Sequence, residues 1–279
     1  MHEILKKLGE RNLLPACPST LIRLAAELRN ETGGSDKLSR VIASDPALTA
    51  ELLKTSNSAF FGAPRVIRSV PEAILLLGQN EIRKIMLFLQ GKYIFNSSAT
   101  LSLKVLRASI WAHALRTAVV ARCIGEKLKS RDPDIYYTAA ILHDIGKIIL
   151  LAHDPKYGEL LAQSGMHGAR LVQCEEERYQ THHALLGGEL LANWRLPEVF
   201  AQLVANHHAE VPLHDPQWNV HKLLSVSNAI AHLLEDSQNP LEQDFESVTP
   251  MLAGFAVTVE VLHGLRPAFE QEFTALKNS

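Results

Sequence analysis

The apolar residues of this 279-residue chain recur at intervals of three and four positions, which is the period of an amphipathic helix. No stretch alternates apolar and polar residues in the manner of a half-buried strand. The pattern therefore predicts an all-α fold, a bundle of many helices.

Residues that favour the start of a helix divide this pattern. Asp, Asn and Ser accept hydrogen bonds from the free N–H groups of a first turn, and proline fits there because it has no N–H to lose. Such signals are Asp45-Pro46, Ser69, Asn80, Asp132-Pro133 and Asp154-Pro155. The helices predicted in this way cover residues 21–28, 35–42, 46–53, 70–77, 81–89, 101–129 (one helix, or two with a bend), 135–152, 182–194, 197–208 and 223–233, with another helix starting at Asp154-Pro155 and a helical tail from 250.

The helical pattern is interrupted at Asn96-Ser97-Ser98. Short polar residues of this kind end helices and open loops. We therefore predict two lobes, residues 1–98 and residues 99–279.

The overall charge argues against some classes of partner. Lys and Arg number 28 and Asp and Glu number 30, so the chain has no basic excess that would bind the phosphates of a nucleic acid. Uninterrupted apolar runs such as Ile148–Ala152 are far shorter than the roughly 20 residues of a membrane-spanning helix. We expect neither nucleic-acid binding nor membrane insertion.

The start of the chain and its cysteines favour the cytoplasm. Met1-His2-Glu3 is polar and does not begin a secretory signal. Cys17, Cys123 and Cys174 are odd in number and widely spaced, which is typical of a reducing compartment.

The strongest candidate for chemistry is His143-Asp144, followed by Gly146 and Lys147. Glycine in a helix costs about 1 kcal/mol relative to alanine, so Gly146 indicates close packing. Adjacent residues of a helix point about 100° apart, which suits a site with Asp144 at its centre and His143 beside it. Lys147, one turn from His143, would lie near a bound phosphate. The alternative is a buried, hydrogen-bonded pair that only locks one helix in place.

Other histidines occupy positions where helices can approach closely. His113 lies among alanines, His183 precedes Gly187-Gly188, and His207-His208 end a predicted helix. One such histidine is usually a core or capping residue. Together with Asp144, the set is typical of metal sites built from the inward side chains of a helix bundle.

The ordered series His113, His143-Asp144, His183, His207-His208 resembles the ligand series of the HD superfamily of metal-dependent phosphohydrolases. Upstream segments resemble the HDOD family, the HD-related output domains of bacterial signalling. They are Leu14-Pro15 with Pro18, Ile42 through Asp45-Pro46-Ala47-Leu48-Thr49, Asn57-Ser58-Ala59, Ser69-Val70 with Glu72-Ala73-Ile74, and Leu77-Gly78.

The resemblance implies an HD-like C-terminal lobe with one or two divalent ions (Fe, Mn, Zn, Ni or Mg) that activate water for attack on a phosphate ester. By position, His113, His143, Asp144 and an aspartate of the last core helix would hold one ion. Asp144, His183, His207 and His208 would hold the other.

The chain departs from the superfamily pattern at three places. Asn228 stands where the aspartate is expected, and an amide oxygen can ligate but brings no negative charge. His182 replaces the acidic residue common before His183. No Gly-Tyr-Pro, the signature of the cyclic-di-GMP phosphodiesterase branch, follows His207-His208.

Three functions follow from these observations. The favoured one is a signalling output module that acts on a protein partner and has an altered metal site, with Phe60-Phe61 as a candidate partner contact. The second is a phosphohydrolase that uses Asp144 and Lys147. The third is binding of a nucleotide or phosphoester without turnover.

Overall fold

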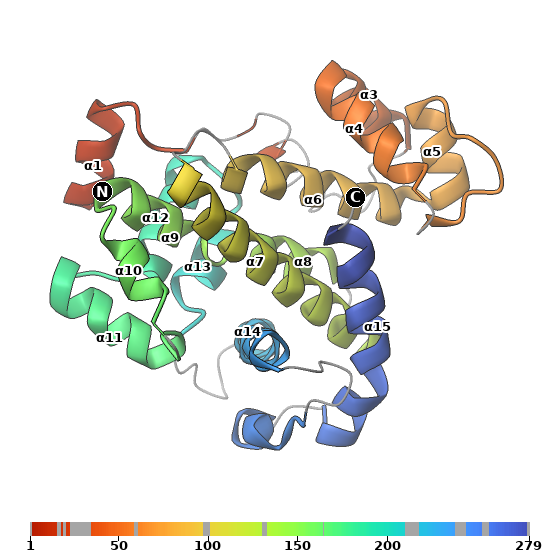
Figure 1. Cartoon of the computed structure of the whole chain (residues 1–279). Coiled ribbons are helices and arrows are strands. Elements are labelled where there is room, and N and C mark those ends of the chain that lie inside the picture. The colour runs from red at the N-terminus through yellow and green to blue at the C-terminus, as the bar shows by residue number, and fades with distance from the viewer. Residues whose placement is uncertain are drawn as a thin grey trace.

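The structure is a computed structural model, and it describes residues 2–15, 18, 21–22, 35–58, 61–96, 101–129, 133–163, 165–209, 218–237, 244–252 and 257–277. Every regular element in these ranges is a helix, which confirms the all-α prediction (Figure 1). The helices run in the order α1 (Glu3–Glu10), α3 (Ser35–Ala43), α4 (Pro46–Ser56), α5 (Val70–Leu77), α6 (Gln79–Asn96), α7 (Leu101–Lys127), α8 (Pro133–Leu142), α9 (Ile145–His153), α10 (Tyr157–Leu161), α11 (Gly168–Tyr179), α12 (His183–Asn193), α13 (Glu198–Ala205), α14 (Trp218–Asp236), the 3-10 helix η3 (Glu246–Leu252) and α15 (Val259–Lys277).

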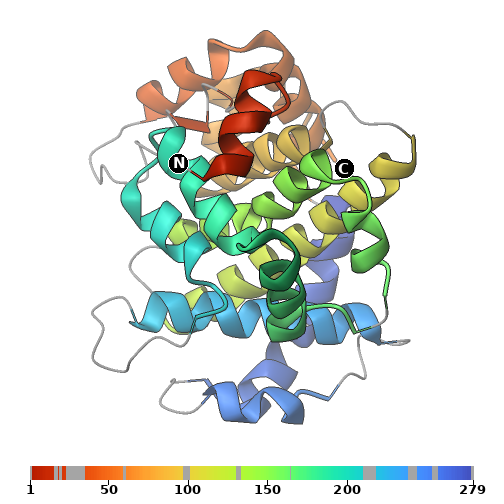
Figure 2. The same ribbon diagram turned by 90° about the vertical axis from the view of Figure 1, so that its left-hand side faces the viewer.

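The long helix α7 is the centre of the bundle. It contacts α6, α8, α14 and α15, while α12 packs between α9 and α13 (Figures 1 and 2). Helices α3, α4 and α5 pack on one another, and α4 and α5 also contact α6. The three form a separate group at one end of the molecule in Figure 1, and α6 joins them to α7.

Helix α1 does not lie with that N-terminal group. It contacts α9, and the backbone N–H of His2 donates to both carboxylate oxygens of Glu189 in α12, at 2.7 and 2.9 Å. The buried apolar residues of both predicted lobes also belong to one continuous cluster. The boundary at residue 98 stays a prediction, and Ser97 and Ser98 lie outside the described residues.

Two of the predicted N-caps are confirmed. Asp45 Oδ1 accepts from the N–H of Leu48 at 3.1 Å, and Ser69 Oγ accepts from Glu72 at 3.3 Å. The predicted cap at Asn80 is wrong, because α6 already begins at Gln79, directly after Gly78. Asp132, Phe60 and most of the predicted helix 21–28 lie outside the described residues.

The predicted single helix over residues 135–152 is instead two helices. Helix α8 ends at Leu142, and α9 begins at Ile145. In the turn between them, His143 Nδ1 donates to the carbonyl of Ala140 at 2.7 Å, and Asp144 takes the N-cap position of α9 without capping it. The Asp144 carboxylate is therefore not used to cap α9 and is available to other groups.

The same segment bears on the expectation about membranes. By length and composition, Ile135–His153 is the one described stretch that could cross a membrane. However, 83% of its apolar window is buried inside the fold, so the stretch serves here as core.

Glycines bring α9, α12 and α13 close together. A Cβ added to Gly146 would lie 1.8 Å from the carbonyl oxygen of His183, and one added to Gly188 would lie 2.7 Å from that of Ala201. Gly187 lies against the backbone of Gly146. The close packing predicted from Gly146 is confirmed, and it sets His183 beside the His143-Asp144 turn.

Gly146→Ala should therefore lower the free energy of unfolding by about 1–3 kcal/mol or more, because backbone atoms must move to admit the methyl group. Gly264→Ala is the control. Gly264 lies in α15 with nothing within 4 Å of a new Cβ, so alanine should stabilise by up to about 1 kcal/mol. Urea denaturation measures both, and equal small effects would contradict the packing argument.

Candidate metal centre

The structure brings all the predicted ligand residues to one place in the bundle. They come from five positions: His113 in the middle of α7, His143 and Asp144 in the turn between α8 and α9, His183 at the first residue of α12, His207 and His208 just after α13, and Asn228 in α14. His207 and His208 thus lie beyond their helix and not inside it as predicted, because α13 ends at Ala205.

His143 and His207 are held in the same way. Each donates its Nδ1 hydrogen to a carbonyl three residues earlier, Ala140 and Val204, at 2.7 Å in both cases. A carbonyl can only accept, so Nδ1 carries the hydrogen and Nε2 carries the lone pair in the neutral ring. Neither Nε2 has a hydrogen-bond partner among the described residues, although both are buried. Two ligand atoms are therefore left facing the cluster.

Asp144 lies between two pairs of imidazoles and is 1% exposed. Its Oδ1 is 3.4 Å from His183 Nε2 and 3.9 Å from His207 Nε2. Its Oδ2 is 3.4 Å from His143 Nε2 and 3.8 Å from His113 Nε2. Each carboxylate oxygen therefore faces one half of the cluster.

These halves match the two ligand groups expected from the resemblance. The ligand atoms of His183, His207 and His208 all lie within 4.8 Å of one another, and so do those of His113, His143 and Asp144. Asp144 Oδ1 has no hydrogen-bond partner among the described residues, like the two Nε2 atoms above. Buried polar atoms without partners are costly, and a cation would satisfy those that ligate it. The residues therefore fit a divalent ion, and their imidazoles favour Fe, Mn, Zn or Ni over Mg.

Protonation also suits a cation. Burial raises the pKa of Asp144, but His143 and Lys147 outweigh it and hold that pKa well below the ordinary value. Burial and His208 hold the pKa of His207 well below the usual range. Burial and His183 lower the pKa of His208 to about 2. Asp144 is thus charged and the two imidazoles are neutral, which are the forms that bind metal.

A further residue, Glu175, fixes His183. His183 donates to Glu175 Oε2 from Nδ1 at 2.6 Å and from its backbone N–H at 2.9 Å, and the Tyr157 hydroxyl donates to Oε1. A carboxylate on the outer nitrogen of a histidine orients the ring and raises its basicity as a ligand. Sequence reasoning missed Glu175 and its helix α11. Glu175 lies four residues after the apolar Leu171 in a charged stretch, and this helical spacing was the one sequence signal that the two share a buried face.

Asn228 contacts the cluster through His113. The Oδ1 of Asn228 is 2.8 Å from His113 Nε2, and Glu235 Oε2 is 2.9 Å from His113 Nδ1. Glu235 was also missed from the sequence, because only the fold places it on the far side of the His113 ring.

His232 forms a stack with His113 and His167. The ring centroids are 4.1 Å apart at 23° in the first pair and 4.3 Å apart at 18° in the second. The ligand atoms of His113, His232 and Glu235 also lie within 4.8 Å of one another. However, a metal bond lies in the plane of an imidazole ring, and nearly parallel stacked rings cannot both point at one ion. This group is a stack and not a second metal site.

Lys147 lies inside the cluster. Its Nζ donates to Asp144 Oδ2 at 2.7 Å, and both side chains are buried. The contact of Lys147 with a phosphate stays a prediction.

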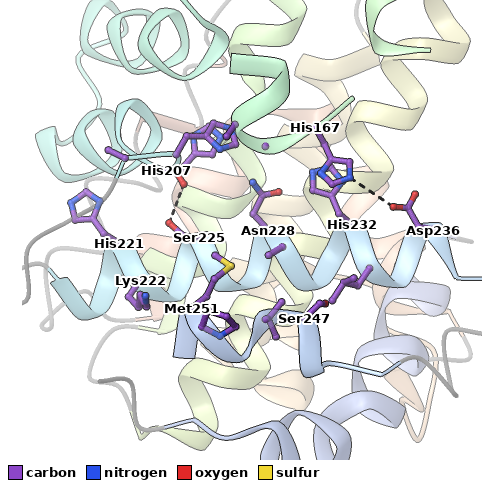
Figure 3. A pocket seen from close by; sticks show the side chains of 18 residues that line it. His167, His207, His221, Lys222, Ser225, Asn228, His232, Asp236, Ser247 and Met251 are labelled. Atoms are coloured by element: carbon purple, nitrogen blue, oxygen red, sulfur yellow. Dashed lines mark hydrogen bonds and ion pairs between the residues drawn. The ribbon is translucent and has the colours of Figure 1, made fainter. Parts of the chain in front are cut away.

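A cavity of about 820 Å³ reaches the cluster from the side of α14. Figure 3 shows His207, Asn228 and His232 on its inner side and Ser247 and Met251 of η3 opposite. Histidines and Lys222 line it, and Asp236 is the one carboxylate among its described lining residues. A ligand in this cavity would meet the edge of the cluster.

The model of the HDOD domain family matches residues 14–210, which is more than half of the sequence. The chain belongs to the HDOD family. The match spans the helices from α3 to α13, whereas α1, α14, η3 and α15 lie outside it.

Solved structures share this fold. An HDOD domain protein of unknown function from Geobacter sulfurreducens superposes with a TM-score of 0.80 at 21% identity, over 98% of this chain and 96% of the other. A predicted phosphohydrolase from Shewanella amazonensis SB2B gives 0.73 at 19% identity, over 99% and 97%. A predicted signal transduction protein from Marinobacter aquaeolei VT8 gives 0.73 at 18% identity, over 99% of this chain and 60% of the other. Likeness at such low identity shows the fold alone.

A relative by sequence is an uncharacterized protein from Treponema pallidum (strain Nichols). It is 25% identical over 278 residues, which cover 94% of this HDOD chain and 51% of the relative. The chain thus spans about half the length of this relative.

Glu175→Gln should lower the free energy of unfolding of the chelator-treated protein by about 1–3 kcal/mol, because the neutral amide loses the charge-assisted hydrogen bonds and directs its NH₂ group at a hydrogen donated by His183 or Tyr157. Glu177→Gln, exposed on the same helix, should change it by less than about 0.5 kcal/mol. Urea denaturation compares the two. Equal stability of the two variants would show that Glu175 does not hold the buried His183.

Proposed function

We propose that this HDOD chain is a regulatory output module of bacterial signalling that holds a divalent ion at an altered HD-type centre and acts through a protein partner. One observation carries the metal part of the proposal. Buried ligand atoms without partners converge on Asp144, while Asn228 replaces the expected carboxylate and binds His113. A ligand set that keeps its histidines and Asp144 but carries less negative charge favours an ion that holds helices together over one that turns over substrate.

The arrangement offers a route from the centre to the N-terminal helices. Trp111, two residues before His113 in α7, packs against Phe88 and Phe95 of α6, with ring centroids 5.6 and 5.7 Å apart. Helix α6 in turn packs against α4 and α5.

A second route leads to the start of the chain. Helix α12 begins at His183 and holds the backbone of His2 through Glu189. A bound ion at Asp144 would fix the His183 ring, from which this second route starts. The protein partner itself is inferred from the output role of the HDOD resemblance.

A second candidate function is hydrolysis or binding of a phosphoester. The observation that favours it is the cavity beside the cluster, which is lined by histidines and Lys222 and has Asp236 as the one carboxylate among its described lining residues. In that case an ion at Asp144 would activate water, and the cavity residues would bind and orient the phosphate.

Asp144→Asn should strip the metal, because the amide keeps the shape of the central side chain and removes its charge. We expect the affinity for Zn²⁺ or Mn²⁺ to fall by more than about tenfold. Loss of a residue that only hydrogen-bonds to a metal ligand already lowers the affinity by about that much. Elemental analysis after dialysis measures this. Asp236→Asn, at the edge of the same cavity, is the control and should keep its metal. Unchanged metal in Asp144→Asn would count against the centre.

The two candidate functions differ in turnover. The metal-loaded protein should leave a panel of phosphoesters and cyclic dinucleotides intact if it is an output module. Turnover that depends on stoichiometric metal and disappears in Asp144→Asn would contradict that function and favour the hydrolase.

A further inference from the structure

We infer that the centre binds one ion and not two: the half formed by Asp144 Oδ1, His183, His207 and His208 takes it, and the chain's own groups fill the other half. This inference rests on the proposed function, because it requires that the cluster holds metal at all. It differs from the two-ion ligand series that the superfamily resemblance implies.

The first half, which we call the open half, has donor atoms that are ready to bind. Asp144 Oδ1 and His207 Nε2 have no hydrogen-bond partner among the described residues. Because Glu175 takes the Nδ1 hydrogen of His183, the Nε2 of that ring faces His208 Nε2, 3.0 Å away. A shift of the His208 hydrogen to Nδ1 would free both Nε2 atoms. Three imidazoles and one carboxylate oxygen are a typical ligand set for one transition-metal ion.

The second half, which we call the closed half, already contains a cation. The ammonium group of Lys147 lies 2.7 Å from Asp144 Oδ2, the oxygen that a second ion would need. Both side chains are buried. A second ion would have to displace the ammonium group and leave its charge buried without a partner, which is strongly unfavourable.

His113 is occupied as well. The Glu235 carboxylate can only accept from a ring hydrogen, so His113 Nδ1 carries one. At Nε2, His113 either donates to Asn228 Oδ1 or, if the amide is turned over, accepts from Asn228 Nδ2. Both arrangements direct Nε2 toward the amide. Among the described residues, His143 Nε2 is then the one potential ligand atom of the closed half without a hydrogen-bond partner. A single imidazole does not hold an ion there.

The charges agree with this division. Among the described residues, Asp144 is the one carboxylate that contacts both halves, and Lys147 already offsets its charge. An aspartate at position 228 would add the missing negative charge, but Asn228 adds none. The nearby carboxylate of Glu235 lies behind the His113 ring, on Nδ1. Two divalent ions sharing Asp144 would repel each other, and the described residues place no second carboxylate between them.

Metal stoichiometry of the full chain tests the inference. The protein would be titrated separately with Zn²⁺ and Mn²⁺ in equilibrium dialysis, and bound metal per chain measured by elemental analysis. We expect one tight ion, and for Mn²⁺ an uncoupled six-line paramagnetic resonance spectrum. Two tight ions per chain would overturn the inference and leave the proposed metal-binding function standing. No bound metal would contradict the proposed function itself.

Two variants locate the ion. His208→Ala removes a partly exposed ligand of the open half and should lower the affinity more than tenfold. His113→Gln changes the closed half and should keep one ion. Helical circular dichroism and thermal unfolding confirm that both fold. Retention in His208→Ala with loss in His113→Gln would place the ion in the closed half and overturn the inference.

A gain of metal tests the roles of Lys147 and Asn228. Asn228→Asp alone should still bind one ion, because Lys147 continues to pair with Asp144 Oδ2. Lys147→Met combined with Asn228→Asp should bind two. Two ions in the single variant, or one ion in a folded double variant, would contradict the assignment of Lys147 as the internal cation.

Discussion

A carboxylate buried at the centre of a helix bundle must have its charge offset, and the surroundings of Asp144 are organised around that need. At 1% exposure, Asp144 has no access to bulk water. One of its oxygens takes the ammonium group of Lys147, and the other faces His183 and His207 with no hydrogen-bond partner among the described residues. Because only one of the two carboxylate oxygens is paired with Lys147, the surroundings of Asp144 differ from those expected in a symmetric two-ion site.

The helices around Asp144 serve to hold that geometry. In the turn between α8 and α9, the Asp144 carboxylate does not cap α9. Because Gly146 has no side chain, the start of α12 can approach this turn closely. Glu175 then fixes the ring of His183 from behind. Because these contacts join α9, α11 and α12, a metal bound at the proposed centre would stabilise the packing of these helices.

The sequence alone predicts the parts of this arrangement that depend on local patterns. Asp45 and Ser69 mark helix starts because a cap acts within one turn, and Gly146 indicates close packing because glycine is unfavourable in a helix. The break at His143-Asp144 was missed because its apolar periodicity continues across the turn. Glu175 and Glu235 were missed because their partners lie in other helices, and a glutamate in a charged stretch normally faces water. The pairing of Lys147 with Asp144 was not predicted either, because the sequence analysis placed Lys147 near a bound phosphate.

The most direct test of a single-ion centre is the anomalous scattering of crystals of the full chain grown with Zn²⁺. The account predicts one strong peak within about 2.0–2.2 Å of the Nε2 atoms of His183, His207 and His208 and of Asp144 Oδ1. It also predicts that the ammonium group of Lys147 remains on Asp144 Oδ2. Two peaks bridged by Asp144, or no peak in the cluster at all, would contradict it.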